Sequence, residues 1–134
     1  MNVVETIAGH YQGTGTWYDS QGKTMNYTVT QKNELIADGF AVEFKHDFDD
    51  GSHTEARFEM HSVASHIFQV TVGRNPMGNA YCIANACKYY IKAGEAFVEV
   101  GYHPTADGLE VYGSSTKNAD GNYIAWHESL RRIK

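Results

Sequence analysis

The sequence predicts an all-β protein, a single up-and-down antiparallel β-barrel of about nine to ten strands with a short N-terminal helical turn. Apolar and polar side chains alternate with a period of two residues along most of the chain. Asp50-Gly51, Asp107-Gly108 and Asp120-Gly121 separate β-rich segments, and Asp-Gly is a dipeptide that hairpin turns favour. Strands joined by such turns form a meander, which removes its exposed edges best by closing into a barrel; a β-sandwich is the alternative. The 134 residues are expected to form one domain, 1–134.

The expected elements follow from the turns and from the alternation between them. Only Asn2 to Ala8 is expected to be helical, and only for a brief turn. In 53–62, Ala56, Phe58 and Met60 share one face, opposite a face of charged and histidine side chains. One expected strand contains Asp38-Gly39, which is either a turn or a bulge. The expected strands are 10–18, 24–32, 35–48, 53–62, 66–74, 79–91, 96–103, 109–116 and 122–132.

The composition of the chain limits which classes of partner and which cellular compartment we expect. The net charge is −5 and no basic stripe is present, so nucleic acid is not an expected partner. The chain contains no apolar run long enough for a membrane span and no basic leader, which favours a cytoplasmic location. Cys82 and Cys87 fall in one expected strand, on opposite faces and roughly 16 Å apart, so they are predicted to be free thiols in a reducing compartment.

The inner face of the predicted barrel supplies a candidate binding site. A barrel of this size is wide enough for one small ligand. The side chains of Tyr27 and His46 are expected to be polar anchors, because His46 is in phase with large apolar residues. An arginine facing inward would favour a ligand with a carboxylate. We therefore expect a small, mostly apolar ligand, held against a wall formed by Phe40, Phe44, Phe58, Met60 and Phe68.

No catalytic motif or metal-ligand spacing is found, so the sequence favours a binding protein over an enzyme and predicts no metal site. In another alternative the barrel is filled and acts through its surface as a structural or interaction module, for instance as a homodimer. His127 alternates with Trp126, and alternation alone does not decide which of the two side chains faces inward.

The chain resembles the calycin group, the lipocalins and fatty-acid-binding-like barrels. Gly9-His10-Tyr11 occupies the position of their G-x-W motif, and Arg131 or Arg132 matches the arginine that packs beneath it. Within this group it is similar in pattern to nitrobindin-like proteins, through the glycine-rich stretch 9–15 and the segment HTEARF (53–58). That resemblance implies a haem held by His127 on the last strand, and nitric-oxide or peroxynitrite chemistry. The haem barrel is therefore the alternative to an apolar-ligand barrel.

Overall fold

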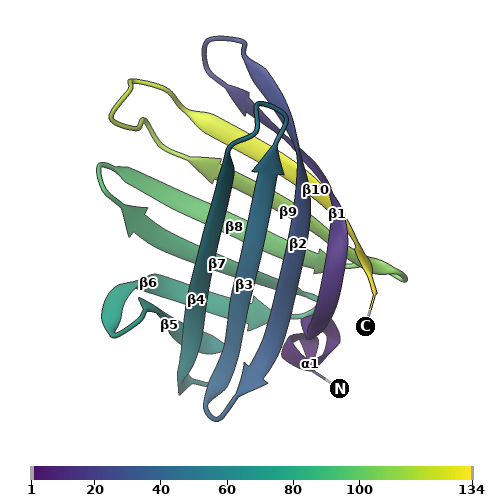
Figure 1. Ribbon diagram of the computed structural model, residues 1–134. Coiled ribbons are helices and arrows are strands. Elements are labelled where there is room, and N and C mark those ends of the chain that lie inside the picture. Colours follow the sequence, from purple (N-terminus) through teal and green to yellow (C-terminus); the bar gives the residue numbers. More distant parts are fainter. Residues whose placement is uncertain (1, 134) are drawn as a thin grey trace.

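Period-two alternation produces ten antiparallel strands in the computed structural model, which describes residues 2–133 (Figure 1). Each strand pairs with its neighbours in sequence, and β1 also pairs with β10, so the sheet closes into a barrel as predicted. No helix in this part of the chain is long and apolar enough to cross a bilayer. The elements are α1 (Val3–Ile7), β1 (Gly9–Asp19), β2 (Thr24–Ile36), β3 (Gly39–Phe48), β4 (His53–Ala64), β5 (Ile67–Val72), β6 (Asn75–Ile83), β7 (Ala86–Ala93), β8 (Ala96–Pro104), β9 (Gly108–Ser115) and β10 (Ile124–Arg132).

Two of the expected strands are divided differently in the structure, and β6 begins earlier, at Asn75. The expected strand 79–91 is two strands, β6 and β7, joined by a tight turn at Ala84, whose φ is 56°. This turn contains neither glycine nor proline, and Asn85 is its local turn signal. Asp38-Gly39 marks a turn between β2 and β3, and β2 extends to Ile36.

The prediction of two free thiols is wrong. Because the chain turns at Ala84, Cys82 on β6 lies opposite Cys87 on β7, and the two form a disulfide with a Cα–Cα distance of 4.1 Å. The distance of roughly 16 Å expected between them assumed a single strand. Free thiols were the reason to expect a reducing compartment. With the disulfide formed, the cysteines no longer favour such a compartment.

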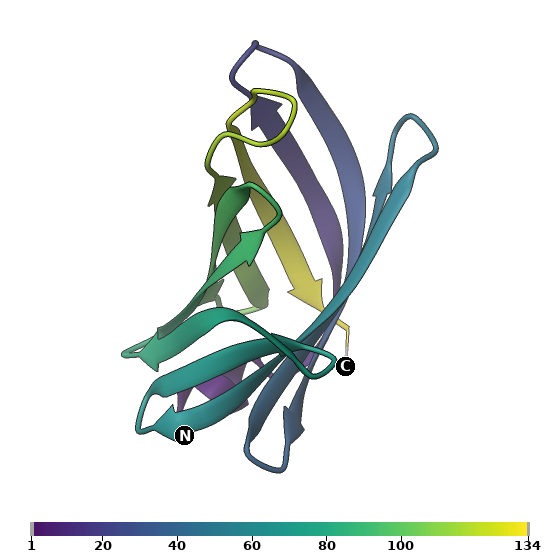
Figure 2. The same cartoon turned by 90° about the vertical axis from the view of Figure 1, so that its left-hand side faces the viewer.

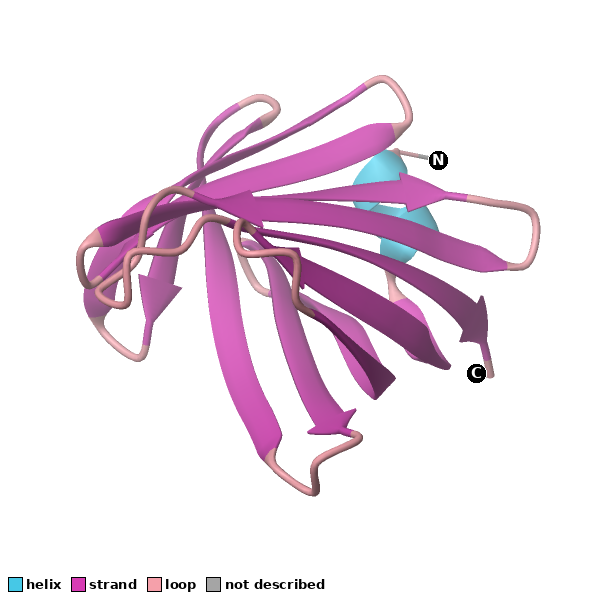
Figure 3. Cartoon of the chain, turned by 90° about the horizontal axis from the view of Figure 1, so that it is seen from above, coloured by secondary structure: helices cyan, strands magenta, loops and turns pink. Residues whose placement is uncertain are grey.

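The helix α1 closes one end of the barrel, the end at which the C-terminus also lies (Figures 1 and 3). Asn2 caps α1 by accepting a hydrogen bond from the Glu5 amide, and Val3 and Ile7 are buried. Arg132 lies over the Tyr11 ring, 5.0 Å from its centroid, and donates to the carbonyls of Thr6 and Ala8. The calycin resemblance implies such a contact between Tyr11 and an arginine near the end of the chain. Of the two candidates, Arg131 and Arg132, it is Arg132 that makes the contact.

The opposite end is open. β4 pairs with β5 only from Glu59 to Ala64, so residues 53–58 have no neighbouring strand on the β5 side among the pairings of residues 2–133. Figure 2 shows the β3–β4 hairpin extending away from β5 and β6 at this end. This end of the barrel is therefore covered neither by α1 nor by a full-length pairing of β4 with β5.

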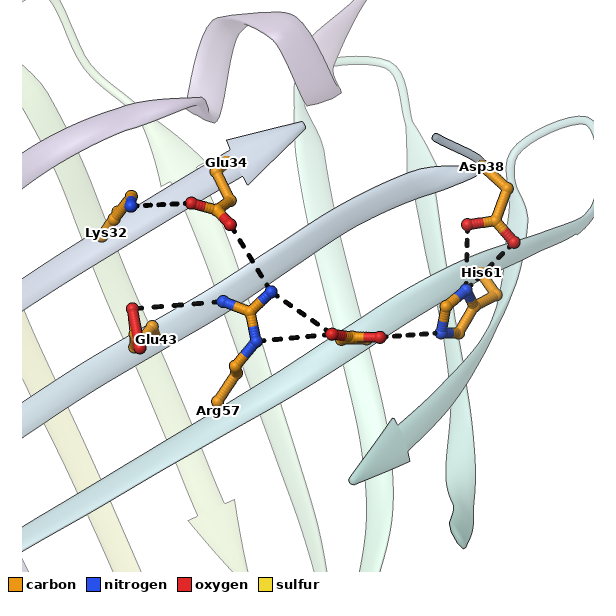
Figure 4. A network of polar contacts seen from close by, with 7 residues as sticks. Lys32, Glu34, Asp38, Glu43, Arg57 and His61 are labelled. Carbon is orange, nitrogen blue, oxygen red and sulfur yellow. Dashed lines mark hydrogen bonds and ion pairs between the residues drawn. The ribbon is translucent and has the colours of Figure 1, made fainter. Parts of the chain in front are cut away.

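The outer face of β2–β4 carries a network of charged side chains (Figure 4). Arg57 approaches Glu34 at 3.5 Å and Glu59 at 3.3 Å, and His61 approaches Asp38 at 2.9 Å. Partly exposed ion pairs of this kind contribute little to stability, so their main consequence is a solvated outer face. The network consists of Lys32, Glu34, Asp38, Glu43, Arg57, Glu59 and His61.

Candidate functional site: a buried carboxylate beneath an aromatic cavity

An aromatic cavity lies at the open end of the barrel, and we call it the upper cavity. Its volume is about 370 Å³, which falls in the range of small-molecule sites. Both tryptophans of the chain line it. The lining residues are Trp17, Tyr27, His46, Phe48, Thr54, Ile124 and Trp126.

A smaller void of about 60 Å³, here the inner chamber, lies deeper in the barrel. His46 and Trp126 line both spaces, so the inner chamber adjoins the upper cavity. The inner chamber differs in chemistry because it is bordered by a carboxylate, an amide and two phenols. Its lining is Gln31, Phe44, His46, Tyr89, Val100, Tyr102, Val111, Trp126 and Glu128.

Glu128 is the carboxylate of the inner chamber, and it is 2% exposed. The Tyr27 hydroxyl donates a hydrogen bond of 2.7 Å to Glu128 Oε2, and His46 Nε2 lies 3.4 Å from the same oxygen. The ring of His46 stacks on Phe44 at 4.6 Å and lies 4.8 Å from the ring of Tyr27. Tyr27, His46 and Glu128 form one cluster, which we call the carboxylate cluster.

Two glycines make room for the aromatic side chains of this site. Gly15 lies between Tyr27 on β2 and Glu128 on β10 in the register of the sheet. A Cβ at Gly15 would lie 2.5 Å from Cζ of Tyr27, so the tyrosine reaches Glu128 across the strand only because residue 15 has no side chain. Gly113 lies opposite Trp126, and a Cβ there would overlap the indole ring. The space that a side chain at residue 15 would take is thus occupied by the ring of Tyr27.

Burial shifts the pKa values of the carboxylate cluster in opposite directions. It raises the pKa of Glu128 from 4.5 to about 7, against the lowering effects of the Tyr27 hydrogen bond and of His127. It lowers the pKa of His46 from 6.5 to about 4, so this imidazole is neutral at pH 7. The pKa of Tyr27 is raised, first by burial and then by Glu128, so its hydroxyl stays protonated and continues to donate.

A chain of buried polar groups continues from the inner chamber to the closed end. Gln31 donates to Asn33 at 3.0 Å, and Asn33 donates to the Ile7 carbonyl at 3.0 Å. The Tyr11 hydroxyl donates to the same carbonyl at 2.8 Å. Because these partners satisfy one another, this chain of polar groups needs no ligand to complete its hydrogen bonds.

The structure separates the predicted wall residues into two groups. Phe40, Met60 and Phe68 are buried in the lower core, where Phe40 and Phe68 pack edge to face at 5.3 Å. None of these three lines the upper cavity or the inner chamber. Phe58 is half-buried and lies 5.5 Å from Tyr89, a lining residue of the inner chamber. Phe44 lines the inner chamber, Tyr27 lines the upper cavity, and His46 lines both.

The last strand carries a site residue that the sequence analysis missed. Glu128 is in phase with Trp126 and Leu130, and this alternation could have indicated an inward carboxylate. His127 points outward, where its Nε2 contacts Glu110 at 2.7 Å and its ring stacks on Tyr112. A haem held by His127 would therefore lie outside the barrel interior. No group of three or more metal-ligating side chains is present among residues 2–133.

Comparisons with known proteins support the fold. Neither a protein-family model nor a curated protein matches the chain. The S-type phycobiliprotein lyase CPES from Guillardia theta matches in structure with a TM-score of 0.76 and 11% identity, over 100% of this chain and 94% of the lyase chain. A redesigned beta barrel matches with a TM-score of 0.43 and 11% identity, over 99% of this chain and 96% of the other. The chain therefore shares with the lyase the fold of a single antiparallel β-barrel, which is closed in this chain.

Proposed function

We propose that this protein binds a small, mostly apolar ligand in the upper cavity, with the carboxylate cluster as its polar anchor. The observation that carries the proposal is an aromatic cavity of about 370 Å³ at the end of the barrel that α1 leaves uncovered. Apolar walls with a few convergent polar groups are typical of small-molecule sites. The similarity to a phycobiliprotein lyase is consistent with a barrel that accepts a ligand, although at 11% identity it supports the fold alone.

The two tryptophans provide the test, because both line the upper cavity. We expect 1-adamantylmethanol, a rigid apolar probe that does not absorb at the tryptophan wavelengths, to change tryptophan fluorescence with a saturable dependence on concentration. A blocking variant, Thr54→Phe, places an aromatic ring in the cavity and should abolish the response. Glu55→Phe is the matched control, because residue 55 is next along β4 and faces the outside.

The filled-barrel alternative makes the opposite prediction. If the barrel acts only through its surface, the probe should produce no saturable change in the native chain. A response that Thr54→Phe and Glu55→Phe weaken equally would also contradict the proposal, because the probe would then be bound elsewhere.

A further inference from the structure

We propose that the ligand is an organic cation, a protonated amine on an apolar body, whose nitrogen contacts Glu128 while the body fills the upper cavity. This presupposes that the upper cavity binds a ligand, as proposed above. It names the chemical class of that ligand and makes Glu128 the residue that selects it.

The charges inside the barrel favour a cation over an anion. The buried polar side chains among residues 2–133 are Gln31, Asn33, Thr71 and Glu128, and neither lysine nor arginine is among them. Arg132 is engaged at the closed end by the carbonyls of Thr6 and Ala8, and Arg131 is exposed. A carboxylate ligand would therefore meet Glu128 with no compensating positive charge, which is costly in a buried site.

Glu128 has an oxygen available for a ligand. Its contacts with Tyr27 and His46 both use Oε2. Within the described chain no donor forms a hydrogen bond with Oε1, although a carboxylate oxygen accepts up to two. An ammonium N–H directed at Oε1 would complete the coordination of this carboxylate with a charge-assisted hydrogen bond.

The walls of the upper cavity also suit a cation. Five of its seven lining residues carry aromatic rings, namely Trp17, Tyr27, His46, Phe48 and Trp126. Ring faces of tryptophan and tyrosine attract ammonium groups within about 6 Å, and the attraction is larger where water is excluded. His46, whose pKa burial lowers to about 4, is neutral and so does not repel a cation beside Glu128. The Lys23 ammonium lies 6.0 Å from the centroid of the Trp17 ring, so this wall of the cavity already attracts a cation.

The volumes of the two spaces fit a ligand with a small charged group on a bulky apolar body. The inner chamber, with about 60 Å³, has room for a group of a few heavy atoms, on the order of one ammonium with its methylene. The upper cavity, with about 370 Å³, holds the body. His46 and Trp126 line both spaces and so lie where the head joins the body.

The experiment uses three probes of nearly equal size: 1-adamantylmethylamine, 1-adamantylmethanol and adamantane-1-carboxylate. Each is titrated at pH 8 into the native chain and followed by tryptophan fluorescence. We expect the amine to bind roughly tenfold to a hundredfold more tightly than the alcohol, as one charge-assisted hydrogen bond predicts. The carboxylate should bind more weakly than the alcohol.

The variant Glu128→Gln assigns the preference to this residue. It keeps the side-chain shape and should bring the ratio of the amine affinity to the alcohol affinity to about one. A far-ultraviolet circular dichroism spectrum that matches that of the native chain shows that the variant is folded. Glu110→Gln, the same substitution on the outer face of β9, should leave all three affinities unchanged.

The outcomes separate this proposal from the proposed function. If the alcohol or the carboxylate binds at least as tightly as the amine, or if Glu128→Gln retains the preference, the cavity still binds a ligand but the assignment of a cation is overturned. If none of the three probes binds, both proposals are overturned.

Discussion

The ionisation of Glu128 gives a quantitative prediction for stability. Burial raises the pKa of this carboxyl from 4.5 to about 7, so the folded protein holds the proton more tightly than the unfolded chain does. The resulting stabilisation is complete below pH 4.5 and is lost as the pH rises through about 7. At about 1.4 kcal/mol per pKa unit, the interval from 4.5 to about 7 corresponds to about 3 kcal/mol.

Glu128→Gln removes this titration and keeps the size of the side chain. Relative to the native chain, the free energy of unfolding of the variant should therefore rise by about 3 kcal/mol between pH 4 and pH 8. His46, whose pKa falls from 6.5 to about 4, titrates in both chains and adds a common slope of opposite sign between these values. The comparison between the two chains cancels that slope.

Urea unfolding at pH 4, 6 and 8, followed by far-ultraviolet circular dichroism, measures this difference. With a slope of about 1–3 kcal/mol per molar urea, the midpoint of the variant should move by about 1–3 M relative to the native chain. Glu110→Gln, a matched change on the outer face, should show a pH-dependent difference below about 1 kcal/mol. A difference for Glu128→Gln that stays constant with pH, or that changes in the native chain's favour, would refute the reasoning.

Three further predictions concern single contacts. Gly15→Ala should displace the Tyr27 ring and lower the free energy of unfolding by about 1–3 kcal/mol in urea, and unchanged stability would show that the ring is not seated on β1. Tyr27→Phe removes a hydrogen bond that lowers the pKa of Glu128, so the carbon-13 titration of this carboxyl should move above pH 7; a shift to lower pH would contradict the contact. Replacing both Cys82 and Cys87 by alanine should lower the free energy of unfolding by about 2 kcal/mol, the value for a short closed loop. A reductant should destabilise the native chain and leave the double variant unchanged. Equal sensitivity of both chains to the reductant would argue against the disulfide.

The fold could be predicted from the sequence because the alternation and the turns are local signals. The barrel, its short helix and the contact between Tyr11 and a terminal arginine were all expected, and the structure contains them. The disulfide was missed because the turn at Ala84 lacks glycine and proline, and Asn85 alone is a weak signal for a break between β6 and β7. Because this one turn was not predicted, two cysteines that face each other across a hairpin were expected to lie far apart on a single strand.

The site could be predicted only in part, for a different reason. Tyr27, Phe44 and His46 could be placed on the inner face because they are in phase with apolar neighbours. Alternation shows which residues face inward, but it does not show which of them border open space, because that depends on how strands far apart in sequence pack. Phe40 and Met60, for example, face inward but lie in a filled part of the core. Glu128 is the harder case, since it shares a face with Trp126 and Leu130, and alternation alone did not decide whether this face or that of His127 points inward.

The most direct test of the central claim, that the upper cavity binds a ligand, is a ¹H–¹⁵N spectrum recorded during titration with 1-adamantylmethanol. The chain has two tryptophans, and both line the cavity. If the cavity binds the probe, the indole N–H signals of Trp17 and Trp126 move together and saturate at one probe per chain. Indole signals that stay fixed while signals from the outer face move would contradict it.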